Sequence, residues 1–247
     1  MKSQQAKYAY GFALEFALFC IISALISLIL IFFMQNFSFS MPITLAVNPT
    51  PVTIVLDAGH GGEDGGCEGN GLVEKDLNLD ITLRIASLLR NQGVKVVLTR
   101  EIDELLYDKN SDYEGKKKYQ DVRRRLEIAK DQENPVLVSI HMNYFAKTQY
   151  SGLQVWYSKA DAKSRILANL VQNNVKNSLQ PNNKRGIKEA TSSIFLLDHA
   201  SCPAILIECG FLSNVDEAHA LGDENYRQKL AEIIFTSIMS YISQNNT

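Results

Sequence analysis

The sequence predicts an α/β fold: a three-layer sandwich with a mostly parallel twisted sheet and helices on both faces, preceded by one N-terminal transmembrane helix. Three observations predict it. Short runs rich in Val, Ile and Leu recur without polar alternation, which is typical of strands covered on both faces. Segments with helical spacing of apolar residues separate these runs, as in an alternating α/β chain. One charge-free apolar stretch near the N-terminus is long enough to cross a bilayer.

The apolar stretch covers residues 16–34, FALFCIISALISLILIFFM, and contains no charge, proline or glycine. A helix needs about 20 such residues to span the hydrocarbon core of a membrane. Lys2 and Lys7 precede the stretch, and no Lys or Arg follows it before Lys75. The positive-inside bias therefore predicts that residues 1–15 are cytoplasmic and that the remainder of the chain is outside.

A cleaved signal peptide is the alternative interpretation, with a weak cleavage candidate at Thr44-Leu45-Ala46. The apolar core is longer than the ~7 to 15 residues of a signal-peptide core, which favours a signal anchor that stays attached. Residues 35–51 contain proline and lack helical period, so we expect a linker there. Residues 52–247 then form one folded domain.

Five strands and four helices are expected within this domain. The strands are 52–57, 94–99, 136–140, 153–157 and 204–207. The helices are 77–89, 119–131, 161–179 and 226–243. Gly93 follows the first helix and allows the chain to turn into the next strand.

Charge and cysteine content exclude two classes of protein. The formal net charge is −2, so nothing indicates a nucleic acid as partner. Cys20 lies in the apolar stretch, and Cys67, Cys202 and Cys209 are an odd set without the spacing of a metal-binding CxxC pair. The sequence therefore predicts no disulfide framework.

Three expected strands lead into residues that can bind a metal or move a proton. His60 ends the run TIVLDAGH, His141 lies in VLVSIHMN, and Glu208 lies in AILIECGFLSN. In open α/β sheets, ligands bind in the crevice outside the carboxyl ends of the strands. We therefore expect these side chains to converge although they are far apart in the sequence.

Glu74 completes a set that is typical of a zinc hydrolase. Catalytic zinc takes three protein ligands, for example two His and one Glu, and leaves the fourth position to water. His60, Glu74 and His141 supply that set, and bound zinc lowers the pKa of its water to about 7. Glu208 can then act first as general base and afterwards as general acid. One zinc ion is expected.

Two further polar residues flank the expected ligands. Metal-bound histidines usually donate their second nitrogen to a carboxylate or carbonyl, so Asp57 is a candidate for that partner. Capping of the turn after its strand is an equally favoured role for Asp57. Asn143 follows His141 by two residues and is a candidate for contact with the ligands or the substrate.

Residues 52–243 resemble the zinc-dependent N-acetylmuramoyl-L-alanine amidases of bacterial cell walls. The segments that carry the resemblance are LDAGHGGEDGG, GLVEKDLNL, VLTRE, LVSIHMN, GLQVWY, RGIKEA and PAILIECGFLSNVDEAHAL. The resemblance implies a zinc ion on His60, Glu74 and His141, with Glu208 as the catalytic residue. It also implies peptidoglycan as substrate and, as the bond cleaved, the amide between N-acetylmuramic acid and the L-alanine of the stem peptide.

A single short catalytic domain behind a membrane anchor looks most like the germination-specific branch of this family. That branch implies a role in spore-cortex maturation, where muramic lactam is formed, or in cell-wall remodelling, with a deacetylase as functional partner. The catalytic domain would then lie outside the cytoplasm and face the wall or cortex. Arg185, in RGIKEA, is a candidate for substrate contact, although a solvated loop charge is the plainer interpretation of that residue.

Two alternatives remain open from the residues alone. The first is a cysteine hydrolase with Cys209 or Cys67 as nucleophile. This mechanism assigns no role to Glu74 or Glu208. The second is a catalytically silent, anchored wall-binding protein on the same fold, because a fold does not fix a function. A missing ligand or base would be its signature, and all four residues are present.

Overall fold

The computed structural model describes residues 18, 21–27, 51–108 and 116–245. Most of the predicted transmembrane segment 16–34 and of the linker 35–51 lies outside these residues. Within the described ranges, no helix is both long enough and apolar enough to cross a bilayer. The chain divides into two compact units, Met1–Val47 and Asn48–Thr247, and the second unit contains all the described strands.

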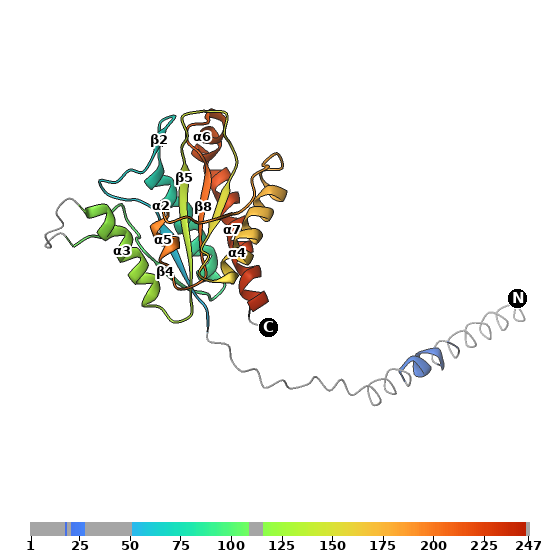
Figure 1. Cartoon of the computed structure of the whole chain (residues 1–247). Helices are drawn as coiled ribbons and strands as arrows, with labels where there is room; N and C mark the ends of the chain where they lie inside the picture. The colour runs from blue at the N-terminus through green and yellow to red at the C-terminus, as the bar shows by residue number, and fades with distance from the viewer. Residues whose placement is uncertain (1–17, 19–20, 28–50, 109–115, 246–247) are drawn as a thin grey trace, which may run out of the picture. The chain divides into compact units, whose positions relative to one another are not determined.

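A six-stranded mixed sheet forms the centre of this unit, with strand order β4-β1-β5-β8-β6-β7 (Figure 1). Strands β4, β1, β5 and β8 are mutually parallel, β6 runs antiparallel to β8, and β7 is parallel to β6. The strands are β1 Thr53–Ala58, β4 Lys95–Leu98, β5 Pro135–Asn143, β6 Gln154–Tyr157, β7 Lys188–Glu189 and β8 Ala204–Phe211. All five predicted strands are present, and the prediction of a mostly parallel sheet is confirmed.

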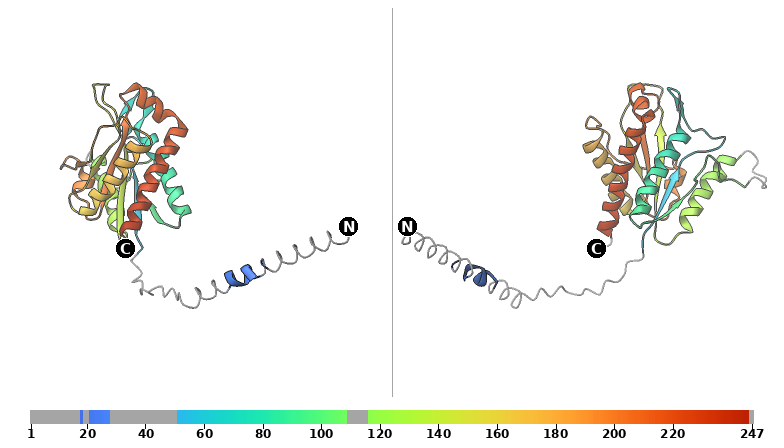
Figure 2. Two further views of the ribbon diagram at one scale, coloured as in Figure 1. Left: turned by 90° about the vertical axis from the view of Figure 1, so that its right-hand side faces the viewer. Right: turned by 180° about the vertical axis from the view of Figure 1, so that it is seen from behind.

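Helices cover both faces of the sheet, as Figures 1 and 2 show from three sides. Helices α2, α4 and α7 pack on one face, and α3 and α5 pack on the other. The helices are α2 Glu74–Asn91, α3 Lys117–Lys130, α4 Ala162–Ser178, α5 Phe195–Asp198, α6 Val215–Gly222 and α7 Glu224–Asn245. The three-layer arrangement of this unit therefore agrees with the sequence pattern.

The central strand β1 shows why its sequence lacks polar alternation. Ile54 and Leu56 point into the apolar core beneath α2, α4 and α7, whereas Val55 points into the smaller core beneath α3 and α5. All three side chains are fully buried. Both faces of the strand are thus apolar, as expected where helices cover a parallel sheet on both sides.

Five elements were not predicted from period: the eight-residue helix α6 and four still shorter elements. A hairpin of two-residue strands, β2 Glu68–Gly69 and β3 Leu72–Val73, leads into α2. Strand β7 and the four-residue helix α5 are equally short. A periodic pattern needs more residues than these elements contain, which is the physical reason that they were missed.

The strand register determines where the predicted functional residues lie. His141 of β5 pairs directly with Glu208 of β8, its parallel neighbour. His60 follows the end of β1, the strand on the other side of β5. The sheet therefore brings the three residues to one edge, the carboxyl end of its parallel strands.

Candidate metal centre

A strained turn after β1 presents the ring of His60. His60 has a φ of 63°, and Gly61 and Gly62 also have positive φ values of 143° and 55°. Non-glycine residues rarely adopt this conformation, and such strain persists where the surroundings hold it. Here Arg125 Nη2 donates a 2.7 Å hydrogen bond to the carbonyl oxygen of His60. The buried guanidinium of Arg125 thus holds the turn in place.

The ring of His141 occupies space that a side chain at position 59, after the end of β1, would fill. A Cβ atom on Gly59 would lie 2.2 Å from Nε2 and Cε1 of His141. A similar restriction applies at Gly66, where a Cβ would lie 2.5 Å from Oε2 of Glu74 and 2.8 Å from Cδ2 of His60. Both glycines therefore make room for the cluster, a role that the sequence did not reveal.

Glu74 is the first residue of α2, and the loop before the helix holds it there. The first helical N–H groups have no partner within a helix; here Glu74 N bonds to Cys67 O at 3.0 Å and Lys75 N to Gly65 O at 3.1 Å. The side chain is also held, since Cys67 N donates to Glu74 Oε2 at 2.8 Å and Met142 N donates to Oε1 at 3.0 Å. The carboxylate is therefore fixed in position by backbone donors.

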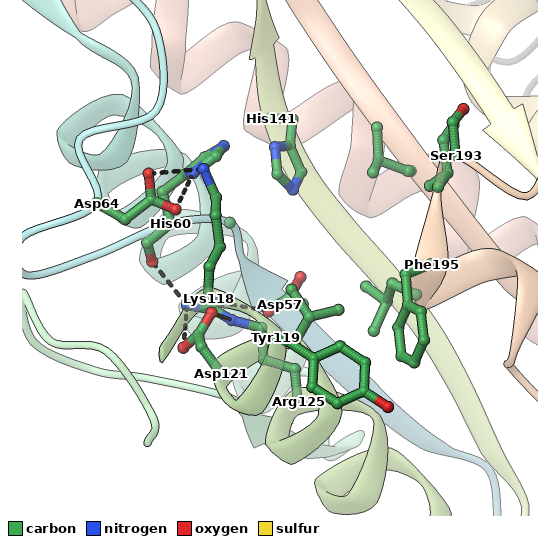
Figure 3. A pocket seen from close by; sticks show the side chains of 15 residues that line it. Asp57, His60, Asp64, Lys118, Tyr119, Asp121, Arg125, His141, Ser193 and Phe195 are labelled. Atoms are coloured by element: carbon green, nitrogen blue, oxygen red, sulfur yellow. Dashed lines mark hydrogen bonds and ion pairs between the residues drawn. The ribbon is translucent and has the colours of Figure 1, made fainter. Parts of the chain in front are cut away.

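The side chains of His60, Glu74 and His141 meet as predicted. One potential ligand atom of each residue lies within 4.8 Å of those of the other two. Glu74 Oε1 is 2.9 Å from His141 Nδ1 and 3.3 Å from His60 Nε2. The two imidazole rings stand edge to face, with centroids 5.0 Å apart, and Figure 3 shows them at the same pocket.

The electrostatic environment of this cluster favours a negatively charged carboxylate, which is what binding of a cation requires. Burial alone would raise the pKa of Glu74, but hydrogen bonds and charge from His141 and His60 lower that pKa strongly. Burial alone would lower the pKa of His60, but Glu74 and Asp64 raise it above its usual value. The carboxylate of Glu74 is thus ionised and faces the two imidazole rings, where a bound metal cation would balance its negative charge.

Asp64, which was not among the predicted site residues, provides the carboxylate that contacts the ring of His60. Its Oδ2 lies 2.8 Å from His60 Nδ1, and Lys118 Nζ reaches its Oδ1 at 3.1 Å (Figure 3). This leaves His60 Nε2 facing Glu74. A carboxylate on the far nitrogen fixes the orientation and tautomer of a metal-binding imidazole. Only the folded turn, which pairs Gly61 with Asp64, brings that carboxylate to the ring.

Asp57 has a different set of partners from the one proposed for it. Its carboxylate accepts hydrogen bonds from Thr99 Oγ1 at 2.7 Å, Ser139 Oγ at 2.5 Å and Arg125 Nη1 at 2.7 Å. Burial would raise its pKa, but Arg125 and Ser139 hold that pKa at about 2. These bonds tie β1 to β5, to α3 and to the residue that follows β4, so Asp57 supports the strand end and forms no hydrogen bond with either histidine.

Glu208 differs from the other acids of the site because one of its carboxylate oxygens is buried without a hydrogen-bond partner. Its Oε2 is inaccessible to solvent and accepts no hydrogen bond from any described residue. Burial and the negative charge of Glu74 raise the pKa of Glu208 to about 8. An acid with a pKa near neutrality, held next to a metal-type cluster, has the properties of a residue that accepts and returns protons.

The thiol alternative has no support in the geometry. Cys209 is fully buried, and burial together with the charge of Glu208 raises the pKa of its thiol. Burial and the charge of Glu74 likewise raise the pKa of Cys67. A nucleophilic cysteine needs a lowered pKa and access to substrate. Both thiols instead stay protonated among apolar or acidic neighbours.

The remaining predicted residues, Asn143 and Arg185, lie together in a pocket of about 580 Å³. A separate pocket of about 330 Å³, drawn in Figure 3, contains His60 and His141 and is walled by α3 and α5. The two pockets share no lining residue. The structure thus separates Asn143 and Arg185 from the pocket that holds the two histidines.

Known proteins give a consistent picture of this chain. The family model described as N-acetylmuramoyl-L-alanine amidase matches residues 54–240. The germination-specific N-acetylmuramoyl-L-alanine amidase of Bacillus subtilis is 31% identical over 226 residues, which cover 90% of this chain and 94% of that protein. The match to this relative extends over nearly the full length of both chains.

Solved structures agree in fold and sequence. The CwlD amidase from Clostridioides difficile, solved in complex with the GerS lipoprotein, superposes with a TM-score of 0.73 at 39% identity, covering 77% of this chain and 98% of that one. The amidase AmiC2 of Nostoc punctiforme gives a TM-score of 0.67 at 31% identity, covering 78% and 97% of the two chains.

Proposed function

The chain belongs to the N-acetylmuramoyl-L-alanine amidase family, and we propose that it hydrolyses its substrate with a zinc ion held by His60, Glu74 and His141. The bond is the amide that joins N-acetylmuramic acid to the L-alanine of the peptidoglycan stem peptide. One observation carries the assignment of the site: the three potential ligand atoms lie within 4.8 Å of one another, and the neighbouring Glu208 has a buried Oε2 atom without a hydrogen-bond partner.

The donor set fits zinc on chemical grounds. Two imidazole nitrogens and one carboxylate oxygen form a typical catalytic zinc set that leaves a position for water. Glu74 is ionised and fixed by backbone donors, and Asp64 orients His60, so the donors are arranged before an ion binds. When bound, zinc supplies an acidified water and polarises the carbonyl group of the scissile amide.

Glu208 carries the proton in this proposal. Amide hydrolysis needs a base that takes a proton from the attacking water and an acid that gives one to the departing amine. The in-register pairing with His141 sets Glu208 beside the ligands, and its free Oε2 is available for the transfer. Its raised pKa of about 8 suits both steps near neutral pH.

The cellular setting is part of the same proposal. Residues 16–34 anchor the chain in a membrane as a signal anchor, residues 1–15 stay in the cytoplasm, and residues 52–247 act outside it, at the wall or the spore cortex. The likeness to a germination-specific amidase supports the cortex role. A deacetylase that acts on the same glycan is one functional partner, and a lipoprotein is a second, since a similar amidase was solved with one.

Metal removal and product identification test the function together. The full-length protein, treated with a chelator and supplied again with zinc, is incubated with purified peptidoglycan, and the products are identified by mass spectrometry. We expect free stem peptides that begin with L-alanine, loss of this release after chelation, and its return with zinc. His60→Ala should lose both zinc and release.

Two results contradict the proposal. Release of stem peptides that survives complete removal of metal would exclude the zinc mechanism. Products in which the sugar is still attached to L-alanine would exclude this amide as the bond that is cleaved. Inhibition by a thiol alkylator in the wild type, absent in a Cys67→Ser/Cys209→Ser variant, would favour the cysteine mechanism instead.

A further inference from the structure

The pocket beside the strand of Glu208 combines aromatic side chains with two cations. Among the described residues that line it are Phe211, Trp156, Arg185 and Lys188, and none of the lining residues is Asp or Glu. Its lining includes residues of β6, of β7 and of the carboxyl ends of β5 and β8. Its lining therefore differs in charge from that of the histidine pocket, which contains three aspartates.

Gln154 connects this pocket to the proposed catalytic residue. Gln154 lies in β6 directly opposite Glu208 of β8 and is almost fully buried. Its Oε1 accepts a 3.0 Å hydrogen bond from Arg185 Nε, and its Nε2 donates to the carbonyl oxygen of Gly186. One amide thus holds the loop that carries Arg185 at a fixed place relative to Glu208, and the charge of Arg185 acts on Glu208.

The two cations are held over aromatic rings without an ion pair. The guanidinium carbon of Arg185 lies 4.9 Å from the ring centre of Phe211, and Lys188 Nζ lies 5.1 Å from that of Trp156. Within the described part of the chain, neither cation forms a salt bridge. The nearby acid Glu217 is already used, because it accepts hydrogen bonds from two backbone N–H groups.

The guanidinium of Arg185 therefore keeps donors for a ligand. Arginine has five N–H donors in a planar fork that matches a carboxylate. Among the guanidinium nitrogens of Arg185, only Nε has a hydrogen-bond partner within the described structure, so both terminal nitrogens remain for an incoming group. In the histidine pocket, by contrast, Lys118 is paired with Asp64 and Arg125 with Asp57 and Asp121.

We propose that Arg185 and Lys188 bind a carboxylate of the stem peptide and make the enzyme select acidic stem peptides. This inference rests on the proposed function. A stem peptide ends in a carboxylate, whereas N-acetylated sugars carry no charge, so the charged part of the substrate fits the unpaired cations. The peptide then leaves the scissile bond toward β6 and β7, and the sugar lies on the side of α3 and α5.

Binding of the free peptide tests the subsite without relying on catalysis. Trp156 is the only tryptophan of the chain and lies beneath Lys188, so its fluorescence reports occupation of the pocket. The full-length protein is titrated with a free stem peptide and with the same peptide whose carboxylates are converted to amides. The acidic peptide should bind about tenfold more tightly, as expected for hydrogen bonds to charged groups.

Variants locate the selectivity. The double variant Arg185→Gln/Lys188→Gln should bind both peptides with the weaker affinity, and Arg185→Gln alone should lose most of the difference. Lys184→Gln is the matched control, because Lys184 is an exposed neighbour that does not line the pocket. It should behave as wild type. In hydrolysis, the double variant should show a higher KM for acidic substrate with kcat little changed.

The outcomes separate this inference from the proposed function. Equal affinity of the wild type for the two peptides, or selectivity that persists in the double variant, overturns the subsite. Selective binding together with no release of stem peptide from peptidoglycan supports the subsite and overturns the hydrolytic function. Hydrolysis of acidic and amidated substrates with the same KM overturns the subsite and leaves the hydrolytic function standing.

Discussion

Two clusters of buried charge lie at the same edge of the sheet and differ in how completely they are paired. In the cluster of Asp57, Asp121 and Arg125, each carboxylate receives hydrogen bonds from the guanidinium, and Asp57 has two further donors. In the cluster of the two histidines, Glu74 and Glu208, one carboxylate oxygen of Glu208 has no described partner. The first cluster stabilises the fold, and the second leaves an acceptor atom available for a ligand or a proton.

The comparison has an energetic basis. A buried polar atom without a partner costs about 1 to 3 kcal/mol of stability, and a ligand or a reaction at that atom can offset this cost. A fully paired network carries no such cost, but it becomes strongly destabilising once one partner is removed. Variants in the two clusters should therefore affect different observables.

The largest effect is expected for Glu208→Gln. The side chain keeps its size but no longer exchanges a proton, so release of stem peptide should fall by about 10² to 10⁴, the usual contribution of a general acid–base group. Zinc binding should be retained, and the free energy of unfolding should not decrease, because the substitution removes no hydrogen bond from the buried Oε2 atom and leaves a neutral side chain there. Product release, metal content and urea denaturation measure the three quantities.

The matched control is Glu232→Gln, which changes an exposed glutamate of α7. It should leave all three quantities within error. A Glu208→Gln protein that releases stem peptide at the wild-type rate would contradict the assigned role, whereas a loss of several kcal/mol in stability would show that Glu208 belongs to the structural class.

Arg125→Met should have the second largest effect, and on stability. It leaves Asp57 buried without its cation, a change that typically costs about 3 to 5 kcal/mol. The carbonyl of His60 also loses its donor, so the strained turn loosens. Chemical denaturation measures the loss. Arg124→Met, on the exposed neighbour, should change stability by less than about 0.5 kcal/mol, and equal effects of the two variants would refute the comparison.

The pH dependence of stability should report the paired cluster with a smaller amplitude. The pKa of Asp57 is lowered from 3.8 to about 2 in the folded protein, so its contribution is complete above pH 4 and is lost as the pH falls toward 2. The shift corresponds to about 2 kcal/mol. The stability difference between wild type and Asp57→Asn should narrow by that amount between pH 4 and 2, and a constant difference would contradict it.

Long periodic elements and strand ends were predictable from the sequence. Continuous apolar runs such as 204–207 predicted buried strands, and the rule on strand ends predicted that His60, His141 and Glu208 converge. Short-range geometry was not predictable. The space that is available at Gly59 depends on the position of the His141 ring on the neighbouring strand, and no local sequence pattern encodes that position. Membrane anchoring at 16–34 stays a prediction.

The two carboxylates near the histidines show the same division. Asp57 directly precedes the end of its strand and appeared suitable as a partner for a metal-bound ring, but Arg125, 68 residues later, takes it. Asp64 carried no signal beyond its place in a glycine-rich loop. The positive φ values of Gly61 and Gly62 fold that loop back, so Asp64 reaches His60 Nδ1 at 2.8 Å.

The smallest expected effect therefore concerns Asp64. Asn in its place keeps an acceptor for His60 but loses the charge that raises the basicity of the ring, and losses of this kind weaken metal binding by about tenfold. Zinc affinity measured by competition with a chelator tests this, with Glu63→Gln, on the exposed neighbouring acid, as control. An unchanged zinc affinity in Asp64→Asn would place Asp64 with Asp57 among residues that support the turn alone.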